Sequence, residues 1–408
     1  MTGYSLRAAT PADLPAMREV IRSNFNGLGA PDPASKLHLV IDPARYLLTE
    51  SDGRIVGTAG ALTRDLAVPG AVIPAAHVTA VTVSPVHTRQ GLLRRMMTEQ
   101  LTTVPEAVAV LWASEGRIYQ RFGYGLASQN VTIRADRREV AIRGTIGTGA
   151  GHVRGAAPTE VLKELSEVYA RALAGRPGLS SRSDAWWTFL TTDLESERDG
   201  HTATRAVLFE NADGVVDGYT RYRVRSQWDD NGPKGEVNVV ELVAATPHAY
   251  AALWRFLLGV DLTRTVVMGL SSVDEPIFHM VDEPRRLAGK IGDGLWLRIV
   301  DLPRALTSRR YAAPVDVVIE VTDALLPANA GRWRLRAGAG GALVNCSPTD
   351  APADLTCDIL ELGAAYLGGT TLGALAATGR VQEHRPGAVA AASTAFGWHV
   401  APASIEIF

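Results

Sequence analysis

The stretch that decides the fold of the first part of this chain is Val81-Thr82-Val83-Ser84-Pro85-Val86-His87-Thr88-Arg89-Gln90-Gly91-Leu92-Leu93-Arg94. It places an apolar strand, predicted from residue 75, before a polar loop, a glycine and a helix predicted to run to residue 103. The first amides of such a helix lack partners within the helix and attract anions. Gly91 lets the backbone approach a phosphate closely, and Arg89, Arg94 and Arg95 surround the turn with positive charge.

The strand before the loop contributes a second half to this predicted site. Amides and carbonyls of Val81 and Val83 that lack a strand partner can pair with an extended amide ligand, as in strand addition. The stretch therefore fits a pyrophosphate that is joined to an extended amide arm. Spacing alone leaves an alternative open, namely an ordinary strand, loop and helix with solvated arginines.

The segments on either side of this stretch predict a mixed α/β sheet. Residues 5–7, 45–50, 55–66 and 108–113 are predicted strands, and helices are predicted after Thr10 and over 118–122. In chain order these elements are strand, helix, hairpin, strand, helix, strand and helix. This order predicts a sheet that is antiparallel at first, with one parallel crossover around Gly91.

A second α/β unit is predicted over roughly residues 133–295, because the order of elements repeats there. Its helices are predicted at 157–174, 184–193 and 247–258, and its strands at 206–208, 218–224, 237–243 and 265–270. Thr246-Pro247-His248 stands where the first unit has its glycine turn. Without Gly or Arg, this copy is not expected to bind a cofactor. Trp186, Trp187 and Trp296 are predicted core residues, and Asp229 to Gly232 a hairpin turn.

The composition shifts from Asp301 onward to strands separated by Gly-rich turns. Strands are predicted at 315–322, 331–336, 342–347, 355–358 and 404–408, and helices at 304–310, 359–366, 372–377 and 387–395. The pattern predicts a compact α+β unit of about a hundred residues, which is a normal domain size.

Charge and cysteine content exclude several classes of protein. The 408 residues hold 41 Lys and Arg against 43 Asp and Glu, so bulk attraction to nucleic acid or an anionic membrane is not expected. The two cysteines, Cys346 and Cys357, form neither a disulfide scaffold nor a spaced metal site, and we expect two free thiols and no metal. His87 is expected to be a loop residue. Without a secretory signal or a membrane span, a cytoplasmic location is expected.

Several motifs together resemble those of one known family. V-T-V-S-P-x-x-x-R-x-G-L-L resembles the acetyl-CoA turn of the GNAT acetyltransferases. Together with A-S-E-G-x-I-Y-x-R-F-G-Y-G from Ala113, E-L-V-A-A-T from Glu241 and G-D-G-L-W-L-R-I-V-D-L-P from Gly292, it resembles the enhanced intracellular survival (Eis) family. The resemblance implies an α/β GNAT domain over 1–132, a degenerate GNAT-like domain over 133–295, and an α+β sterol-carrier-protein-like domain over 296–408. It also implies a homohexamer built as a dimer of trimers.

The resemblance implies acetyl-CoA as co-substrate, and it assigns the residues that bind it. These residues are Val81, Thr82, Val83, Arg89, Gln90, Gly91, Leu92, Leu93, Arg94, Ser114 and Glu115. The chain departs from the family at Thr88, where an Arg usually stands three residues before the turn glycine. Because backbone amides should carry most of the phosphate binding, we expect weaker electrostatic attraction to the cofactor rather than loss of function.

Two catalytic groups follow from the same resemblance. Tyr119 matches the family's general acid, which protonates the departing thiolate, while Tyr124 is a nearby competitor in a position usually filled by a packing aromatic residue. The chain ends on apolar residues and is expected to end inside the protein. Phe408 matches the family's terminal residue, whose carboxylate is the general base. The family's acidic residue beside it is Ile407 here, and Glu406 would face the other way in a strand.

The implied reaction is acetylation of primary amines on cationic substrates, namely aminoglycosides, with lysine side chains as a second class. Acidic residues near the pocket should add affinity, and Asp13, Asp32 and Glu406 are unranked candidates. The alternative is a catalytically weak binding or scaffold protein that uses the sterol-carrier-like domain. Thr88 favours that alternative, whereas Tyr119 and Phe408 favour the enzyme.

Overall fold

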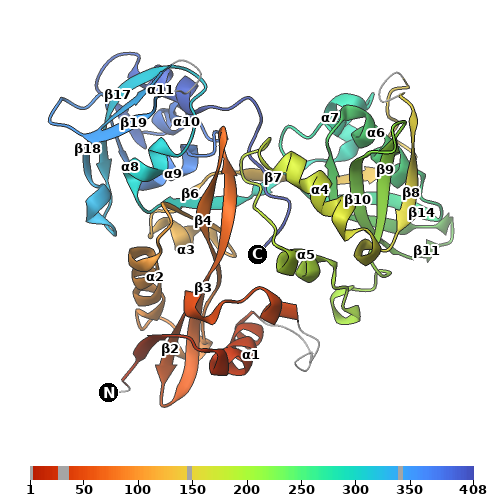
Figure 1. The fold of residues 1–408 in the computed structure, drawn as a ribbon, viewed down its shortest axis with the longest axis horizontal. Coiled ribbons are helices and arrows are strands. Elements are labelled where there is room, and N and C mark those ends of the chain that lie inside the picture. Colours follow the sequence, from red (N-terminus) through yellow and green to blue (C-terminus); the bar gives the residue numbers. More distant parts are fainter. Residues whose placement is uncertain (1–2, 26–35, 145–148, 339–342) are drawn as a thin grey trace. The chain divides into compact units, whose positions relative to one another are not determined.

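The computed structural model describes residues 3–25, 36–144, 149–338 and 343–408 (Figure 1). The chain divides into two compact units. The first comprises Met1–Ser128, Gly294–His399 and Ile407–Phe408, and the second comprises Gln129–Asp293 and Val400–Glu406.

A seven-stranded sheet forms the N-terminal part of the first unit, in the order β1-β2-β3-β4-β5-β16-β6. The strands are β1 (Ser5–Ala8), β2 (Tyr46–Ser51), β3 (Arg54–Val68), β4 (Ala71–Val83), β5 (Val108–Trp112), β16 (Leu295–Ile299) and β6 (Gly125–Leu126). Strands β1 to β4 pair antiparallel, and β4 pairs parallel with β5 after a crossover through α2 (Leu92–Thr103). This confirms the predicted antiparallel meander and its parallel crossover near Gly91.

The sixth strand of this sheet comes from a distant part of the chain. Strand β16 pairs antiparallel with β5 on one side and with β6 on the other. The apolar run Leu295–Ile299 was not assigned to this sheet from the sequence, because the neighbouring residues do not indicate which strand it pairs with. The strand that pairs with the second edge of β5 therefore lies almost two hundred residues later in the chain.

A long hairpin of β3 and β4 dominates the sheet and is drawn in orange in Figure 1. Its two-residue turn is Pro69-Gly70, since Val68 pairs with Ala71. The proline ring fixes φ at the first turn position, and Gly70 has φ +69° at the second, which a side chain would disfavour. These two residues keep the register of β4, the strand that carries the predicted cofactor site.

Alternating side chains let the two faces of β5 pack against different partners. Ala109 and Leu111 belong to one apolar cluster, together with Met97 and Leu101 of α2. Val108 and Val110 belong to another cluster, which extends into the C-terminal part of the unit. Further along the sheet, Met17 of α1 (Leu14–Asn24) covers Tyr46 and Leu48 of β2. The end of β5 is thus held from both sides.

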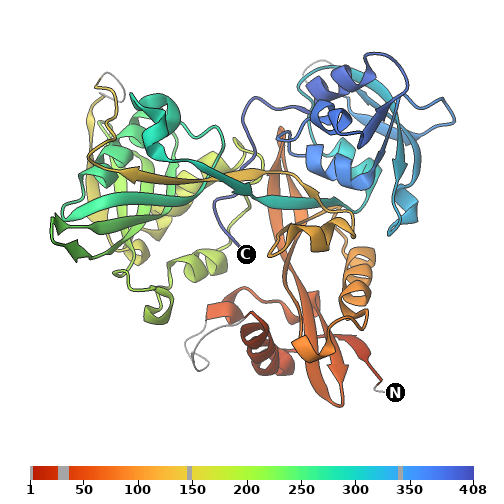
Figure 2. The ribbon, with the colours of Figure 1, turned by 180° about the vertical axis from the view of Figure 1, so that it is seen from behind.

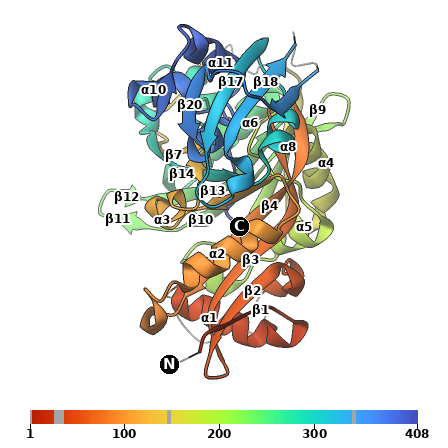
Figure 3. The same ribbon diagram turned by 90° about the vertical axis from the view of Figure 1, so that its left-hand side faces the viewer.

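The C-terminal part of the first unit contains a five-stranded sheet with helices packed on it (Figure 3). Its strands, in sheet order, are β19 (Asn345–Pro348), β18 (Gly331–Ala337), β17 (Val315–Thr322), β20 (Leu355–Asp358) and β21 (Val381–Glu383). Its helices are α8 (Leu302–Thr307), α9 (Ile359–Ala365), α10 (Leu372–Ala377) and α11 (Ala388–Phe396). The predicted elements within the described residues are confirmed apart from shifted ends, the added β21 and the strand predicted at 404–408. Cys346 and Cys357 are buried and unpaired, as expected.

The second unit is built on another seven-stranded sheet, in the order β15-β7-β14-β13-β10-β9-β8 (Figure 2). Its strands in chain order are β7 (Gln129–Asp136), β8 (Gly151–Ala156), β9 (Arg205–Asn211), β10 (Val216–Arg225), β13 (Gly235–Ala244), β14 (Thr263–Ser271) and β15 (Lys290–Asp293). Helix α6 (Pro247–Gly259) covers one face, and α4 (Leu162–Leu173) and α5 (Asp184–Thr191) cover the other. Four of these strands were predicted, whereas β7, β8 and β15 were not.

Smaller expectations for the second unit are also confirmed. Trp186 and Trp187 are buried in α5. Asp229 pairs with Gly232 in a short hairpin of β11 (Trp228–Asp229) and β12 (Gly232–Pro233), as expected for a turn. Of the paired strands described in this unit, β13 and β14 alone run parallel, which repeats the topology of β4 and β5 in the first unit.

The strand predicted at residues 404–408 is wrong. Within the described residues 343–408, the structure assigns no strand after α11, although the last residues are largely buried. Alternation of apolar and polar residues indicates two faces, but a strand also needs a neighbouring backbone to pair with. Side-chain contacts hold this segment instead, among them an ion pair between Glu406 and Arg182.

Candidate active site

Strands β4 and β5 separate at the point where the cofactor site was predicted. They pair only at Ala76 with Ala109 and at His77 with Val110, although β4 continues to Val83. The register of β4 against β3 also shifts, and Ala80 has φ +52°, which marks a bulge. Residues 79–83 are half-buried even though β4 is an inner strand. The separated strands leave room for an extended ligand to pair with β4.

The loop after β4 leads to a helix end that has no side-chain cap. Gly91 is the N-cap of α2 with φ +76°, and it carries no side chain to satisfy the first amides of the helix. Arg89, which also has positive φ, is exposed, as is Arg94, and neither forms an ion pair among the described residues. Open amides, the helix dipole and two available cations together suit a pyrophosphate group.

Thr88 does not supply the positive charge of the arginine that the resemblance led us to expect there. Its hydroxyl donates to the Pro85 carbonyl at 2.9 Å, within the loop itself. Arg95 is also engaged, because it donates to the Tyr4 carbonyl at 3.1 Å. All three arginines therefore bring positive charge to this turn, and Arg89 and Arg94 have no such contact in the described structure.

A cavity of about 310 Å³ opens between the separated strands. Thr79, Ala80 and Val81 line it from β4, and Trp112, Ala113 and Ser114 line it from the end of β5. Tyr119 and Phe408 complete the wall together with Phe25 and Ile407. The structure thus brings four predicted site residues to one cavity, namely Val81, Ser114, Tyr119 and Phe408. Glu115 is exposed just beyond Ser114, and the turn residues 89–94 are not among the lining residues.

Tyr119 and Tyr124 occupy different environments despite their proximity in sequence. Tyr119 lies in the short helix α3 (Gly116–Gln120) and lines the cavity, and burial raises the pKa of its phenol above the usual value. Tyr124 is completely buried, and its hydroxyl has no hydrogen-bond partner in the described structure. The two rings are 6.0 Å apart between centroids. Of these two tyrosines, Tyr119 is the one that can present a phenolic proton to the cavity.

Phe408 rests against a buried histidine that the sequence did not single out. The rings of His77 and Phe408 meet edge to face, with centroids 4.7 Å apart. Burial, together with the positive charge of Arg64, lowers the pKa of His77 to about 3. Its Nδ1 lies 3.1 Å from the Ala75 carbonyl, an acceptor that requires the proton on that nitrogen. His77 is therefore neutral at physiological pH and supports the Phe408 ring without adding charge.

Two of the three candidate acidic residues for binding a cationic substrate already have partners in the protein. Asp13 forms a two-point ion pair with Arg7, whose hydrogen bonds hold the pKa of the Asp13 carboxyl well below its usual range. Glu406 pairs with Arg182 at 2.8 Å. Asp32 lies outside the described residues. Asp13 and Glu406 are thus structural ion-pair partners, which the sequence could not show because the arginines lie 6 and 224 residues away.

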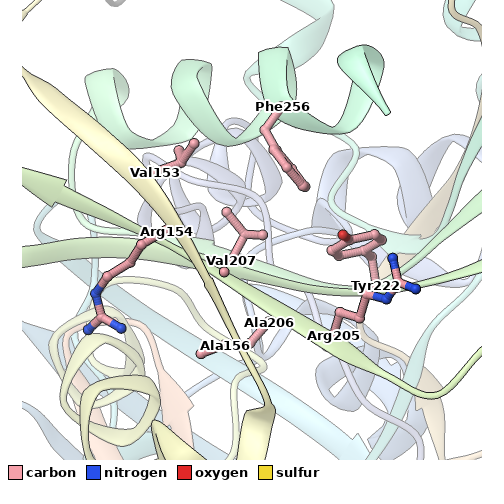
Figure 4. Close-up of a pocket in the computed structure, with 9 residues that line it drawn as sticks. Val153, Arg154, Ala156, Arg205, Ala206, Val207, Tyr222 and Phe256 are labelled. Atoms are coloured by element: carbon pink, nitrogen blue, oxygen red, sulfur yellow. The ribbon is translucent and has the colours of Figure 1, made fainter. Parts of the chain in front are cut away.

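The corresponding helix of the second unit begins differently. The Thr246 hydroxyl accepts a hydrogen bond from the Ala249 amide at 3.1 Å and caps α6. The cavity of about 240 Å³ in this unit lies elsewhere, between α6 and strands β8 to β10 (Figure 4). Val207 and Phe256 form its apolar wall, and the guanidinium group of Arg154 points away from them. The start of α6 thus differs from that of α2, because a side chain caps one of its first amides.

Three regions of the chain match models of known protein families. Residues 5–127 and 178–299 each match a model described as an acetyltransferase (GNAT) domain, and residues 302–404 match a sterol carrier protein domain. The N-acetyltransferase Eis of Mycobacterium tuberculosis is 34% identical over 395 residues, which cover 93% of each chain.

The chain belongs to the Eis family of GNAT N-acetyltransferases.

Further relatives extend over similar lengths of this Eis-family chain. An uncharacterized N-acetyltransferase of Streptomyces avermitilis is 44% identical over 87% of this chain and 89% of its own. The crystal structure of Eis1 from Mycobacterium abscessus matches all of both chains with a TM-score of 0.83 and 33% identity. A GCN5-related N-acetyltransferase from Anabaena variabilis, at 19% identity and a TM-score of 0.85, supports the fold alone.

Membership in the Eis family confirms the expected fold class and the enzyme class. The protein is an N-acetyltransferase with two GNAT domains followed by a sterol-carrier-protein-like domain, and its GNAT domains imply acetyl-CoA as co-substrate. Among the described residues, no group of His, Cys, Asp and Glu side chains is placed to hold a metal ion. In the same residues, every helix is too short or too polar to cross a bilayer.

Gly91 offers a direct test of the cofactor turn in this Eis-family enzyme. We expect Gly91→Ala to raise KM for acetyl-CoA about tenfold, which is about 1.4 kcal/mol of binding, because a Cβ would stand where phosphate approaches the backbone. Gly379→Ala is a matched control, since Gly379 also has φ +76° and no described atom lies within 4 Å of an added Cβ. Both variants should lose similar stability by thermal unfolding. An equal rise of KM in both would contradict the assignment.

Proposed function

We propose that the protein transfers the acetyl group of acetyl-CoA to a primary amine of a cationic substrate, with aminoglycosides as the principal class and lysine side chains as a second. The observation that carries this proposal is the cavity that Val81, Tyr119 and Phe408 line together. One wall suits an extended amide ligand, a second holds a phenol, and the third is the end of the chain with its carboxylate.

The cofactor is proposed to bind along β4 and across the turn. Backbone groups of Val81, Thr82 and Val83 pair with the amide arm, and the open amides around Gly91 bind the pyrophosphate. Arg89 and Arg94 add charge, and Gln90, Leu92, Leu93, Ser114 and Glu115 complete the site by their positions beside it. Leu92 is buried at the base of α2, which keeps the turn in place.

The reaction is proposed to proceed by direct transfer with one base and one acid. The Phe408 carboxylate removes a proton from the substrate ammonium, directly or through one water molecule. The neutral amine forms a nitrogen–carbon bond to the thioester carbonyl, and the carbon–sulfur bond breaks. Tyr119 donates its proton to the departing thiolate, so that coenzyme A leaves as a thiol. The new amide nitrogen gives up its one remaining extra proton to water, and the Tyr119 phenolate takes a proton back from water. The raised pKa of Tyr119 supports this role, because the phenol stays protonated until it is needed.

Substrate charge is proposed to be recognised by aromatic rings and the chain end rather than by acidic side chains. Among the described residues that line the cavity, none carries an acidic side chain, whereas Phe25, Trp112, Tyr119 and Phe408 bring four aromatic rings to it. Aromatic faces attract cations, most strongly where water is excluded. The terminal carboxylate supplies the negative charge among these lining groups, which suits a polyamine presenting one amine at a time.

A panel of amines tests this function directly. Purified protein with acetyl-CoA and kanamycin or neomycin should release free coenzyme A thiol, and mass spectrometry should show products heavier by one or more acetyl groups. Lysine-containing peptides form the second arm of the panel. If none of the amines accelerates thiol release above the rate of thioester hydrolysis, the proposal fails. We also propose the homohexamer, for which light scattering should give about six times 43.5 kDa, or roughly 261 kDa.

A further inference from the structure

A buried arginine in the second unit binds the last part of the chain. The Arg182 side chain is 0% exposed and lies 3.7 Å from the Tyr169 ring centroid and 4.7 Å from that of Trp187. It pairs with Glu406 through Nε and Nη2, both at 2.8 Å, and it also pairs with Glu241. Glu406 is the third residue from the end of the chain. A fully buried arginine is therefore committed to holding the chain terminus.

The charges around Arg182 balance within the cluster. Glu241 accepts a hydrogen bond from the Tyr219 hydroxyl at 2.5 Å and lies 3.4 Å from Arg221. Burial opposes the ionisation of Glu241, but the charges of Arg182 and Arg221 outweigh it and lower its pKa to about 2. Two cations thus face two carboxylates, Glu241 and Glu406. Removal of one member of such a buried group leaves an uncompensated charge, so the pairing is a strong restraint on Glu406.

The residues before Glu406 are also anchored to the second unit. Arg176 donates to the Ala401 carbonyl at 2.7 Å, and the Ala401 amide donates to Asp274 at 2.9 Å. The Ala403 amide donates to the Pro177 carbonyl at 2.9 Å, and Ile405 packs in the apolar cluster of α4 and α5. We call residues 401–406, with these partners, the tail clamp. The clamp takes the place of strand pairing, which the structure does not assign to this described segment.

The clamp holds the chain two residues before Phe408, which carries the proposed general base. The last few residues of a chain are poorly ordered unless something ties them down. From Glu406, two further residues reach at most about 7 Å, so a fixed Glu406 confines the terminal carboxylate to a small volume. A proton acceptor loses much of its effect when it is misplaced by about 1 Å. Fixing residue 406 is therefore a means of placing the group at residue 408.

We propose that Arg182 and Glu406 are positioning residues for the terminal carboxylate, and that the second GNAT-like domain, which lacks the cofactor turn, acts on the reaction through the tail clamp. This inference rests on the proposed role of the Phe408 carboxylate as general base. It gives the degenerate domain a function in the reaction without any contact to acetyl-CoA. Neither Arg182 nor Glu406 is among the residues that line the cavity.

Steady-state kinetics of the full-length protein test the proposal. We expect Glu406→Ala to lower kcat for amine acetylation at least about tenfold, with KM for acetyl-CoA within about twofold, because the base is loosened while the cofactor turn is untouched. Glu406→Gln keeps a hydrogen bond to Arg182 and should lower kcat only about threefold. Thermal unfolding shows whether each variant is folded. If Glu406→Ala does not fold, the milder Glu406→Gln still tests the proposal.

An ion pair elsewhere in the second unit supplies the matched control. Asp193 pairs with Arg198 at 2.9 Å and with Arg223 at 2.8 Å, and it has no part in the tail clamp. Asp193→Asn should leave kcat within about twofold of the wild type. An equal loss of kcat in Asp193→Asn and the Glu406 variants would overturn the proposal, because general loosening of the unit would then explain both.

A chain extended by one glycine after Phe408, which displaces the carboxylate, separates the two hypotheses. If the extension leaves kcat unchanged, the proposed base is wrong. If the extension lowers kcat but both Glu406 variants stay within about twofold of wild type, the clamp proposal is wrong. In the extended chain, Glu406→Ala should add little further loss, because its effect passes through the carboxylate. A full, independent loss there would also overturn the proposal.

Discussion

Extension of the chain by one glycine after Phe408 is expected to lower kcat for amine acetylation by about a hundredfold, the lower range for loss of a general base. The Phe408 ring can stay against His77 in this variant, but the carboxylate moves away by one residue. KM for acetyl-CoA should change little, since the turn at Gly91 is not altered. Steady-state assays with one aminoglycoside, with both substrates varied in turn, measure both quantities.

The position of the carboxylate and the packing of the ring can be separated by a second variant. Phe408→Leu keeps the carboxylate on the same residue and replaces the edge-to-face contact with aliphatic packing. Its kcat should fall by less than about tenfold, because aromatic pairs contribute about 0.5–1.5 kcal/mol. A greater loss in Phe408→Leu than in the extended chain would show that the ring matters rather than the charge.

Replacement of Tyr119 by phenylalanine is expected to have the second large effect. Tyr119→Phe removes the phenolic proton and leaves the ring in the cavity wall, so kcat should fall about a hundredfold or more. The thiolate would then have to leave unprotonated or take a proton from water. Rates of coenzyme A thiol release at saturating amine give the comparison.

Tyr124→Phe is the control for this substitution. Its hydroxyl is buried without a partner in the described structure, so its loss sacrifices no hydrogen bond and should leave both kcat and stability nearly unchanged. If Tyr124→Phe lowers kcat as strongly as Tyr119→Phe, the two tyrosines have been assigned to the wrong roles.

The pH dependence of the wild-type rate follows from the same two groups. A terminal carboxyl group normally has a pKa of about 3.3–3.7, and burial raises the pKa of Tyr119 above its usual value near 10. The base is then ionised and the acid protonated throughout the range from about pH 6 to about pH 9. The rate should therefore rise over this range as the substrate amine loses its proton, without a fall on the alkaline side. A decline of kcat below about pH 9 would indicate that Tyr119 ionises too early to be the acid.

The parts of the site that could be predicted from the sequence alone are those whose structure depends on residues close together in the chain. The loop, glycine and helix after Val83 form one local pattern, and Tyr119 belongs to a motif that spans Ala113 to Gly125. Their chemistry depends on backbone geometry that short segments dictate, such as positive φ at Gly91 and the uncapped helix end. The three-part architecture was likewise accessible, because each part has its own pattern of strands and helices.

The parts that could not be predicted depend on contacts between distant residues. Asp13 and Glu406 are acidic and near functional segments, but only the folded chain shows that Arg7 and Arg182 already neutralise them. The sequence shows His77 only as a residue within an apolar strand, and its contact with Phe408 is visible only in the folded chain. The wrong terminal strand has the same origin, since a pattern of alternation does not reveal whether another backbone lies alongside.

The late origin of β16 bears on how the protein is made. When the ribosome has completed residues 1–132, β5 still has an open edge, because its partner lies at Leu295–Ile299. At about 5–20 residues per second, that partner is synthesised roughly ten to thirty seconds later. Until then the nascent chain exposes an apolar strand edge, which is a template for misassembly. The sheet of the N-terminal GNAT domain is thus complete only once the chain has reached Ile299, and excision of residues 1–132 as a minimal catalyst would remove a strand from between β5 and β6.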